Sequence, residues 1–181
     1  STAIGNGSFA MGDLSFAMGS SVANGVGSVA LGIGSYAFGD NSFGMGLNAQ
    51  AGGDFSIAMG ENINATGDYS MAFGELATAS ANNSLVFGLG SGNPVTTGAN
   101  TAAFFMGDQT GVNVSAPNVF GVYGGSMIID PSAPATNVLP DTALEIEGTL
   151  KIAYGNEACD ASRIGAIHFD SSSERFFVCQ N

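Results

Sequence analysis

The fold is decided by residues 42–88, which read SFGMGLNAQAGGDFSIAMGENINATGDYSMAFGELATASANNSLVFG. A heptad Ser-x-[Ala/Gly/Val]-x-Gly starts here at 42, 56, 70 and 84, and earlier at 1, 8, 15, 21, 28 and 35. Every interval is seven or a multiple of seven, except the step of six from Ser15 to Ser21. Glycine in each repeat costs a helix about 1 kcal/mol, and the apolar residues lie two apart, which is strand spacing. Each heptad therefore predicts a short strand that turns at its glycine.

Alternate heptads differ in their second and fourth positions, so the true repeat is fourteen residues, one coil of two strands. Position three is mostly Ala and predicts a narrow interior, while positions two and four point outward. One outer face is then apolar and needs a cover, which copies around a cyclic axis would supply. The predicted trimer-interface residues are Phe43, Met45, Ile57, Met59, Met71, Phe73, Leu85 and Phe87. The alternate heptads carry Gln50, Gly52, Asn64, Thr66, Thr78 and Ser80 instead.

Composition narrows the function. The 181 residues include 28 Gly and only 10% charged residues, against about 25% in typical domains, so we expect little helix. The net charge of -12 disfavours nucleic acid and anionic lipid as partners, and no apolar run is long enough to span a membrane. His168 is the only histidine, and aspartates do not recur at calcium-ligand spacing. We therefore predict no enzymatic activity, no cofactor and no metal.

Residues 1–88 resemble the head repeats of trimeric autotransporter adhesins. The strong half of that repeat is matched by Gly27-Ser28-Val29-Ala30-Leu31-Gly32 and Asn41-Ser42-Phe43-Gly44-Met45-Gly46. The resemblance implies a homotrimeric, left-handed parallel β-roll at the cell surface. No stalk or membrane anchor is recognised, and because the chain starts inside a repeat we expect a segment of a longer protein.

Aromatic residues depart from this family's pattern at the N-terminal end. Counting by coils places Tyr36 and Phe38 on the polar outer side, and Phe9 and Met11 there as well if the six-residue step permits. These four are candidate ligand contacts. Closer packing between chains at that end is the alternative.

The repeat loosens after Gly88, which predicts three regions: β-roll repeats over 1–88, a transitional region over 89–130, and a C-terminal β module over 131–181 that begins with a proline-rich connector. In the transitional region, 101–107 and 118–124 are predicted strands, and 89–100 and 108–117 are loops with binding potential. In the last region, apolar residues alternate over 144–154, and 164–169 with 175–179 predicts a hairpin.

Residues 143–179 read ALEIEGTLKIAYGNEACDASRIGAIHFDSSSERFFVC and resemble the tail of phage-type tail fibres and of the mosaic adhesive trimeric proteins of predatory bacteria. A head roll joined directly to this module suits the predatory fibres better. Cys159 and Cys179 predict one disulfide in an extracellular protein, with two free buried thiols as the alternative.

All positive charge lies in the last region, so a pocket there could hold an acidic sugar or phosphate. The candidate ligand-binding residues are Arg163, His168, Arg175 and Tyr123. The alternative for the cations is pairing with Glu145, Glu147 or Asp160.

Two functions remain open at this point. The first is a non-enzymatic, extracellular fibre adhesin that recognises a glycan or envelope component of a prey or host cell. The second is a structural segment of a phage-like or bacterial tail fibre, without a ligand site of its own. Ice binding would need regular outward Thr rows, and only Thr66 and Thr78 occupy such positions.

Overall fold

The computed structural model describes residues 1–125, 127–129, 144–146, 167–170 and 175–178. The chain divides into two compact units, Ser1–Met127 and Ile128–Asn181, and each is described by itself. Regular structure in the described residues consists of β-strands, with no helix among them. The predicted all-β class is confirmed.

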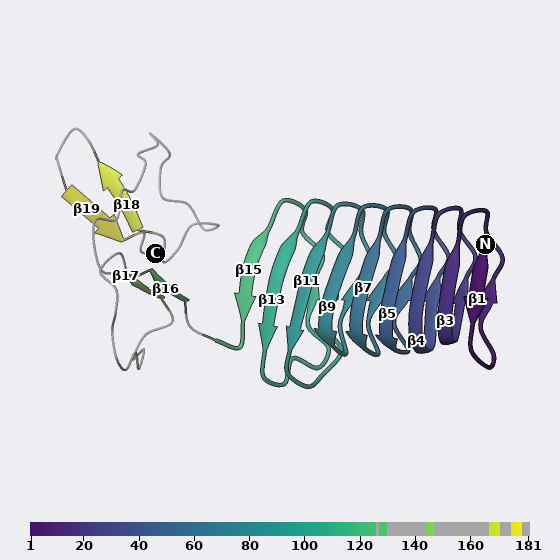
Figure 1. Cartoon of the computed structure of the whole chain (residues 1–181). Helices are drawn as coiled ribbons and strands as arrows, with labels where there is room; N and C mark the ends of the chain where they lie inside the picture. Colours follow the sequence, from purple (N-terminus) through teal and green to yellow (C-terminus); the bar gives the residue numbers. More distant parts are fainter. Residues whose placement is uncertain (126, 130–143, 147–166, 171–174, 179–181) are drawn as a thin grey trace. The chain divides into compact units, whose positions relative to one another are not determined.

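The first unit is a parallel β-solenoid whose strands stack coil upon coil (Figure 1). Within the regular coils each residue is paired with the one fourteen positions later, as in Phe43↔Ile57 and Ile57↔Met71. The predicted coil of fourteen residues is confirmed. One face is built from β1 Thr2–Ile4, β3 Phe16–Ala23, β4 Val29–Ala37, β5 Phe43–Leu47, β7 Ile57–Glu61, β9 Met71–Glu75, β11 Leu85–Leu89, β13 Ala102–Met106 and β15 Phe120–Tyr123.

The second face is built from shorter strands. These are β2 Phe9–Ala10, β6 Gln50–Ala51, β8 Asn64–Ala65, β10 Thr78–Ala79, β12 Val95–Thr96 and β14 Asn113–Val114. The longer strands β3 and β4 turn the corner and contribute to both faces, because β4 pairs with β5 through its first half and with β6 through its second. Two strands per coil were predicted, and the structure has them.

The interior between the two faces is filled almost entirely by alanine. Position three of both heptads is inaccessible to solvent, as Ala58 on the first face and Ala65 on the second show. The inner sides of the two strands lie close together in the regular coils, so the alternation along each strand sends most large residues outward. Ile63, Val86 and Phe105 are the larger side chains that the interior accepts. The narrow interior inferred from the Ala column is confirmed.

From Ser15 to Ser84 the serine that opens a heptad is buried, a role that the repeat pattern left unassigned. Before the long strands its hydroxyl donates to the carbonyl oxygen three residues back, as in Ser56 Oγ to Gly53 O at 2.6 Å and Ser70 Oγ to Gly67 O at 2.6 Å. A buried hydroxyl without a partner is costly, and this bond satisfies it while closing the turn. Ser42 differs, because its buried Oγ has no hydrogen-bond partner.

The glycine that ends each long strand is required by the stacking. Gly46 and Gly60 have φ of 134° and 141°, which residues with a Cβ rarely adopt. A Cβ on Gly60 would also overlap the carbonyl oxygen of Gly74 in the next coil. The turn at the repeat glycine was predicted, and the close approach between coils adds the reason for glycine at this position in β5, β7 and β9.

The six-residue step from Ser15 to Ser21 is absorbed as an irregularity in strand register. β3 and β4 are in register from Phe16↔Val29 to Ser20↔Ile33, and the pairing resumes one residue shifted at Val22↔Tyr36. Phe9 pairs with Val22 in turn. Phe9 therefore lies on the second face with Tyr36, the placement that sequence counting left conditional.

The solenoid continues beyond Gly88 with enlarged coils. Leu85 pairs with Ala102 and Ala102 with Phe120, so the added residues lie in loops after β11 and β13, and Gln109 N donates to Ser91 O at 3.0 Å between these loops. The glycine position is taken by Phe105, whose ring is 1% exposed and fills the wider corner. The strands predicted within 101–107 and 118–124 are confirmed as β13 and β15.

Two further strand pairs follow β15. β16 Met127–Ile129 pairs with β17 Leu144–Ile146, and β18 Ile167–Asp170 pairs with β19 Arg175–Val178 in antiparallel register. The antiparallel pairing predicted for 164–169 and 175–179 is confirmed over the described strands. Three expectations stay predictions. They are the division of the chain into 1–88, 89–130 and 131–181, the left-handed coiling and the trimeric assembly.

Candidate binding surfaces

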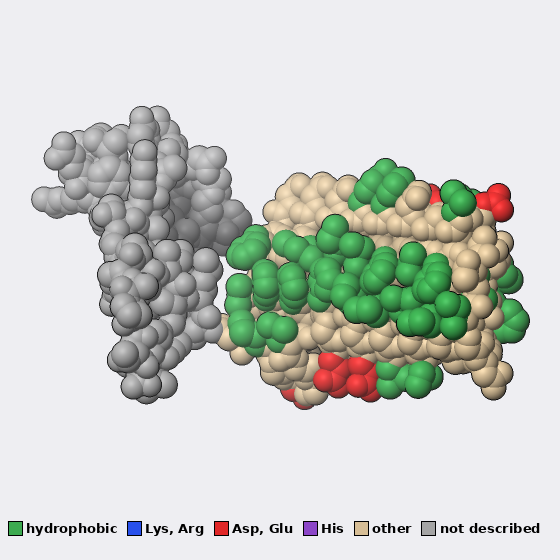
Figure 2. Space-filling model, in the orientation of Figure 1, with side chains coloured by type: hydrophobic (Ala, Val, Ile, Leu, Met, Phe, Trp, Pro, Cys, Tyr) green, Lys and Arg blue, Asp and Glu red, His purple; other side chains and the backbone are tan. Residues whose placement is uncertain are grey.

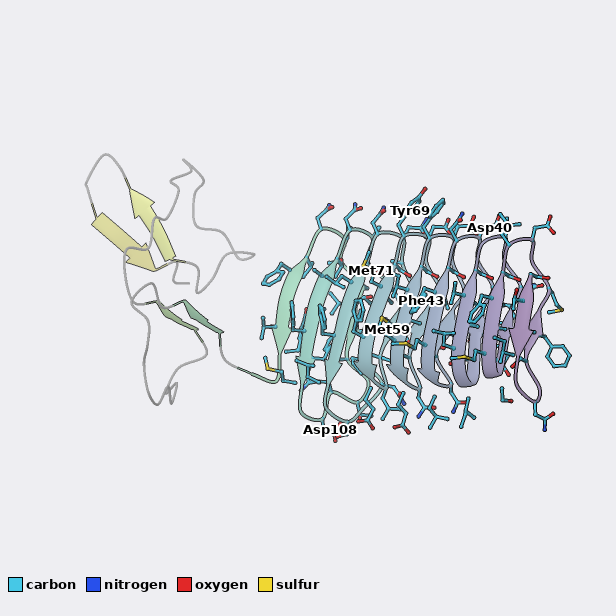
Figure 3. The ribbon with its side chains drawn as sticks, viewed as in Figure 1. Asp40, Phe43, Met59, Tyr69, Met71 and Asp108 are labelled. Carbon is cyan, nitrogen blue, oxygen red and sulfur yellow. The ribbon has the colours of Figure 1, made fainter. Side chains whose placement is uncertain are left out.

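The apolar face of the solenoid is defined by the outward residues at positions two and four of the long strands. All eight predicted trimer-interface residues lie in these two columns, in register from coil to coil. Figure 2 shows their side chains as a continuous hydrophobic band along the unit, and Figure 3 places Phe43, Met59 and Met71 within it. Such a band is larger than monomeric soluble proteins usually leave in water.

Aromatic rings stack along the C-terminal part of this face. Phe73 and Phe87 have ring centroids 5.2 Å apart, Phe87 and Phe104 have centroids 4.7 Å apart, and Phe104 meets Phe120 edge to face at 6.0 Å. These contacts run along the coil stack, so they hold neighbouring coils together as well as presenting an apolar surface. Phe104 and Phe120 extend the predicted interface columns beyond residue 88.

The polar face is defined by the outward residues of the short strands. Gln50, Asn64 and Thr78 form one column, and Asn64 Nδ2 lies 3.5 Å from Thr78 Oγ1. Toward the N-terminal end the same face becomes apolar. Tyr36 and Phe38 are stacked there with centroids 5.4 Å apart, and both are exposed. Their predicted location on this face is confirmed, while ligand contact by Phe9, Met11, Tyr36 and Phe38 stays a prediction.

A ladder of Asp and Asn side chains runs along the turns that precede the long strands, and sequence reasoning missed it. Asp54 Oδ1 accepts a hydrogen bond from Asp40 N at 2.9 Å, and Asp68 Oδ1 accepts one from Asp54 N at 3.0 Å. Asn82 Oδ1 continues the series to Asp68 N at 3.0 Å. The signal that could have revealed it is the Asp or Asn two residues before Ser at 14-residue spacing. We call this line of turns the acidic edge.

The residue after each ladder position adopts a left-handed backbone. Asn41 and Asn83 have φ of 54° and 57°, as suits Asn, but Phe55 and Tyr69 occupy the same place with φ of 55° and 57°. A left-handed conformation costs most residues about 1–2 kcal/mol, and only Gly, Asn and Asp visit it routinely. Phe55 and Tyr69 are 46% and 56% exposed, so burial does not repay that strain within the chain.

The loops of the enlarged coils form the opposite edge, where Figure 3 shows Asp108. Asp108 Oδ1 accepts hydrogen bonds from Thr110 Oγ1 at 2.6 Å and from Thr110 N at 3.1 Å. Both bonds favour the ionised carboxylate, and they lower the pKa of Asp108 below its ordinary value. This loop is therefore ordered by its own side chains, but ligand binding by the predicted loops 89–100 and 108–117 is untested.

The four candidate ligand-binding residues are divided between the two units. Tyr123 belongs to the solenoid, where its ring stacks on Phe105 with centroids 5.0 Å apart. In the second unit His168 is the register partner of Phe177, and Arg175 is the register partner of Asp170. Arg163, Cys159 and Cys179 lie outside the described residues. The predicted ligand site and the predicted disulfide both stay predictions.

The described residues contain no group of three or more His, Cys, Asp or Glu side chains placed to hold a metal ion. Among them, no helix is long and apolar enough to cross a membrane.

Part of the chain matches a known family of repeats. Residues 23–43, 39–62 and 65–91 match the YadA head domain repeat, and these segments amount to less than half of the 181 residues. No curated protein matches the chain significantly. The matched repeats and the parallel solenoid that they form fit the head of a trimeric autotransporter adhesin. The likeness to predatory-bacteria fibres and tail-fibre tips has no support beyond the residues that suggested it.

Proposed function

We propose that this chain is a segment of a non-enzymatic fibre adhesin, displayed outside the cell, that binds a glycan or envelope component of another cell, prey or host. The observation that carries the proposal is the apolar face on a solenoid whose interior is already closed by alanine. That face contributes nothing to the core of its own chain. The match to YadA head repeats supplies the adhesin context.

Assembly as a homotrimer is the first part of the proposal. Met45, Met71 and Phe120 are 36%, 38% and 64% exposed in the single chain, and identical faces around a three-fold axis would cover all three copies at once. Burying apolar surface is worth about 25 cal/mol per Å², and two columns along the whole solenoid supply a large area. The proposed interface consists of Phe43, Met45, Ile57, Met59, Met71, Phe73, Leu85 and Phe87.

Ligand recognition is the second part. The solenoid, residues 1–127, carries no Lys, Arg or His, so an anionic ligand is excluded from most of the surface by charge. Lys151, Arg163, His168 and Arg175 all follow it in the chain, which supports an acidic sugar or phosphate as the ligand of the C-terminal region. Tyr123 was assigned to the same role, and its stacking on Phe105 makes it the weakest member of the set.

A glycan array probed with the purified assembly tests recognition. Specific binding that is lost on deleting residues 88–181 would support recognition by the C-terminal part. Intact assemblies that bind nothing on the array or on envelope fractions of candidate target cells would contradict the adhesin proposal. That second result would favour the structural alternative, a phage-like or bacterial fibre segment whose ligand site lies elsewhere.

A further inference from the structure

Phe55 and Tyr69 form a stacked pair on the acidic edge. Their ring centroids are 5.0 Å apart and their planes differ by 4°. The two residues occupy equivalent turns of adjacent coils, since Phe55 N donates to Asp40 O and Tyr69 N donates to Asp54 O. Figure 3 shows Tyr69 projecting from this edge, beside the long strands and away from the middle of the apolar face.

Burial does not account for aromatic side chains at these positions, and within the chain the two rings gain their contact with each other. The same column holds Asn41 before the pair and Asn83 after it, and asparagine tolerates the left-handed backbone that both turns need. Phe55 and Tyr69 accept the strain without being buried. An outlier of this kind motivates a functional hypothesis when a second feature accompanies it, and here that feature is the stacking of the two rings.

The pair presents a geometry that suits a sugar ring. One face of each ring is turned to the other, so the remaining faces look along the column toward the shorter Asn41 and Asn83. The C–H-bearing side of a pyranose packs flat against such an aromatic face, as apolar groups do on the electron-rich side of a ring.

The residue that precedes each ring in the chain carries a hydrogen-bond acceptor. Asp54 and Asp68 precede Phe55 and Tyr69, and each uses Oδ1 to accept a backbone N–H of the ladder. Within the described part of the chain, their Oδ2 atoms accept no hydrogen bond, which leaves an acceptor for a sugar hydroxyl on the residue before each ring. The same carboxylates would repel a sialic or uronic acid.

From the aromatic pair and its flanking carboxylates we infer a second recognition site, a shallow platform for neutral pyranose rings at Phe55 and Tyr69. It deepens the proposed adhesin function and rests on it, but it differs in place and in ligand charge from the C-terminal site. A single platform of two rings binds a sugar weakly. Three copies of the platform on one fibre raise the apparent affinity through multivalency.

The test uses the whole chain and a glycan array that carries neutral and sialylated pyranosides at high density. The variant Phe55→Asn/Tyr69→Asn gives both turns the residue found in neighbouring coils, so its thermal stability should be equal or higher. Leu14→Asn is the matched control, because Leu14 occupies the same column with φ of 57° and is 84% exposed. We expect the double variant to lose about tenfold in binding to neutral pyranosides, and Leu14→Asn to lose none.

Each other outcome overturns the inference in its own way. If the double variant binds as the unmodified chain does, the platform is wrong while the adhesin proposal stands. If the double variant no longer assembles, the two rings are a contact between chains and not a ligand site. If the unmodified chain binds only sialylated glycans, the platform is wrong and the C-terminal site is favoured. If it binds no glycan at all, the glycan part of the proposed function fails as well.

Discussion

The apolar and polar faces of the solenoid are built on the same interior but present different surfaces. Ala58 and Ala65 are both fully buried at the same position of their strands, while the outward neighbours of Ala58 are Ile57 and Met59 and those of Ala65 are Asn64 and Thr66. The interior therefore determines the fold, and the outer positions are free to determine partners. Closing the interior does not require methionine and phenylalanine on one outer face over successive coils.

The largest expected effect comes from breaking the interior that the two faces share. Ala65→Leu forces three added carbons into a closed space and should destabilise the chain by about 3 kcal/mol or more. Thr66→Leu, one residue along and facing outward, should change the free energy of unfolding by no more than about 0.5 kcal/mol. Urea unfolding of both variants measures the difference, and equal losses would show that position 65 is not an interior position.

The next largest expected effect distinguishes the apolar face from the polar face. Met59→Asp places a carboxylate in the proposed interface of every chain, where an uncompensated buried charge costs about 3–5 kcal/mol. Thr66→Asp adds the same charge at the corresponding position of the polar face and should leave assembly unchanged. Light scattering after size-exclusion chromatography reports the mass of each. An interface on the polar face would reverse the order of the two variants.

A smaller effect tests the turns that lead into the apolar face. Ser56→Ala removes the hydroxyl that donates to Gly53 O and should cost about 1 kcal/mol. Ser42→Ala removes a buried hydroxyl without a partner and should be neutral or stabilising. Thermal unfolding compares the two at equal concentration, and equal destabilisation would mean that both hydroxyls are bonded.

The smallest expected effect concerns the loop around Asp108 in the enlarged coils. The pKa of Asp108 is lowered by its bonds from Thr110, so the order that these bonds give the loop is complete above the ordinary carboxyl pKa and is lost as the pH falls through the lowered value. The protection factor of the Thr110 amide against hydrogen exchange, which corrects for the intrinsic effect of pH, should fall on acidification relative to that of the Val95 amide in β12. In Asp108→Asn the Thr110 amide should exchange quickly already at neutral pH. Slow exchange in that variant would show that the ionised carboxylate does not order the loop.

The repeat predicted the period, the alanine interior and the outward columns because these follow from strand alternation, which the residues at positions two, three and four encode directly. Other features depend on neighbouring coils, so they were missed. The Asp54 and Asp68 ladder needs a backbone N–H fourteen residues away, and the strain at Phe55 and Tyr69 needs a backbone angle. Alternation along β13 turns Phe105 inward while Phe104 stays outside, but the sequence does not show that the interior has room for a ring there.

The C-terminal region has no heptad repeat from which its fold could be predicted. The apolar runs 164–169 and 175–179 were sufficient to predict a hairpin, since a polar turn between two such runs specifies strand pairing locally, and the structure has the antiparallel pair over 167–170 and 175–178. Arg163, His168 and Arg175 were inferred as ligand-binding residues from their charge alone. The scarcity of positive charge indicates the part of the chain in which such residues lie, but not how their side chains are arranged.

The central claim is that copies of this chain cover the apolar face, and sedimentation equilibrium of the unmodified chain at micromolar concentration tests it most directly. A homotrimer predicts one species with about three times the 18.0 kDa mass of the chain. A folded species that stays at 18.0 kDa over the whole concentration range, with its β-sheet circular dichroism intact, would contradict it.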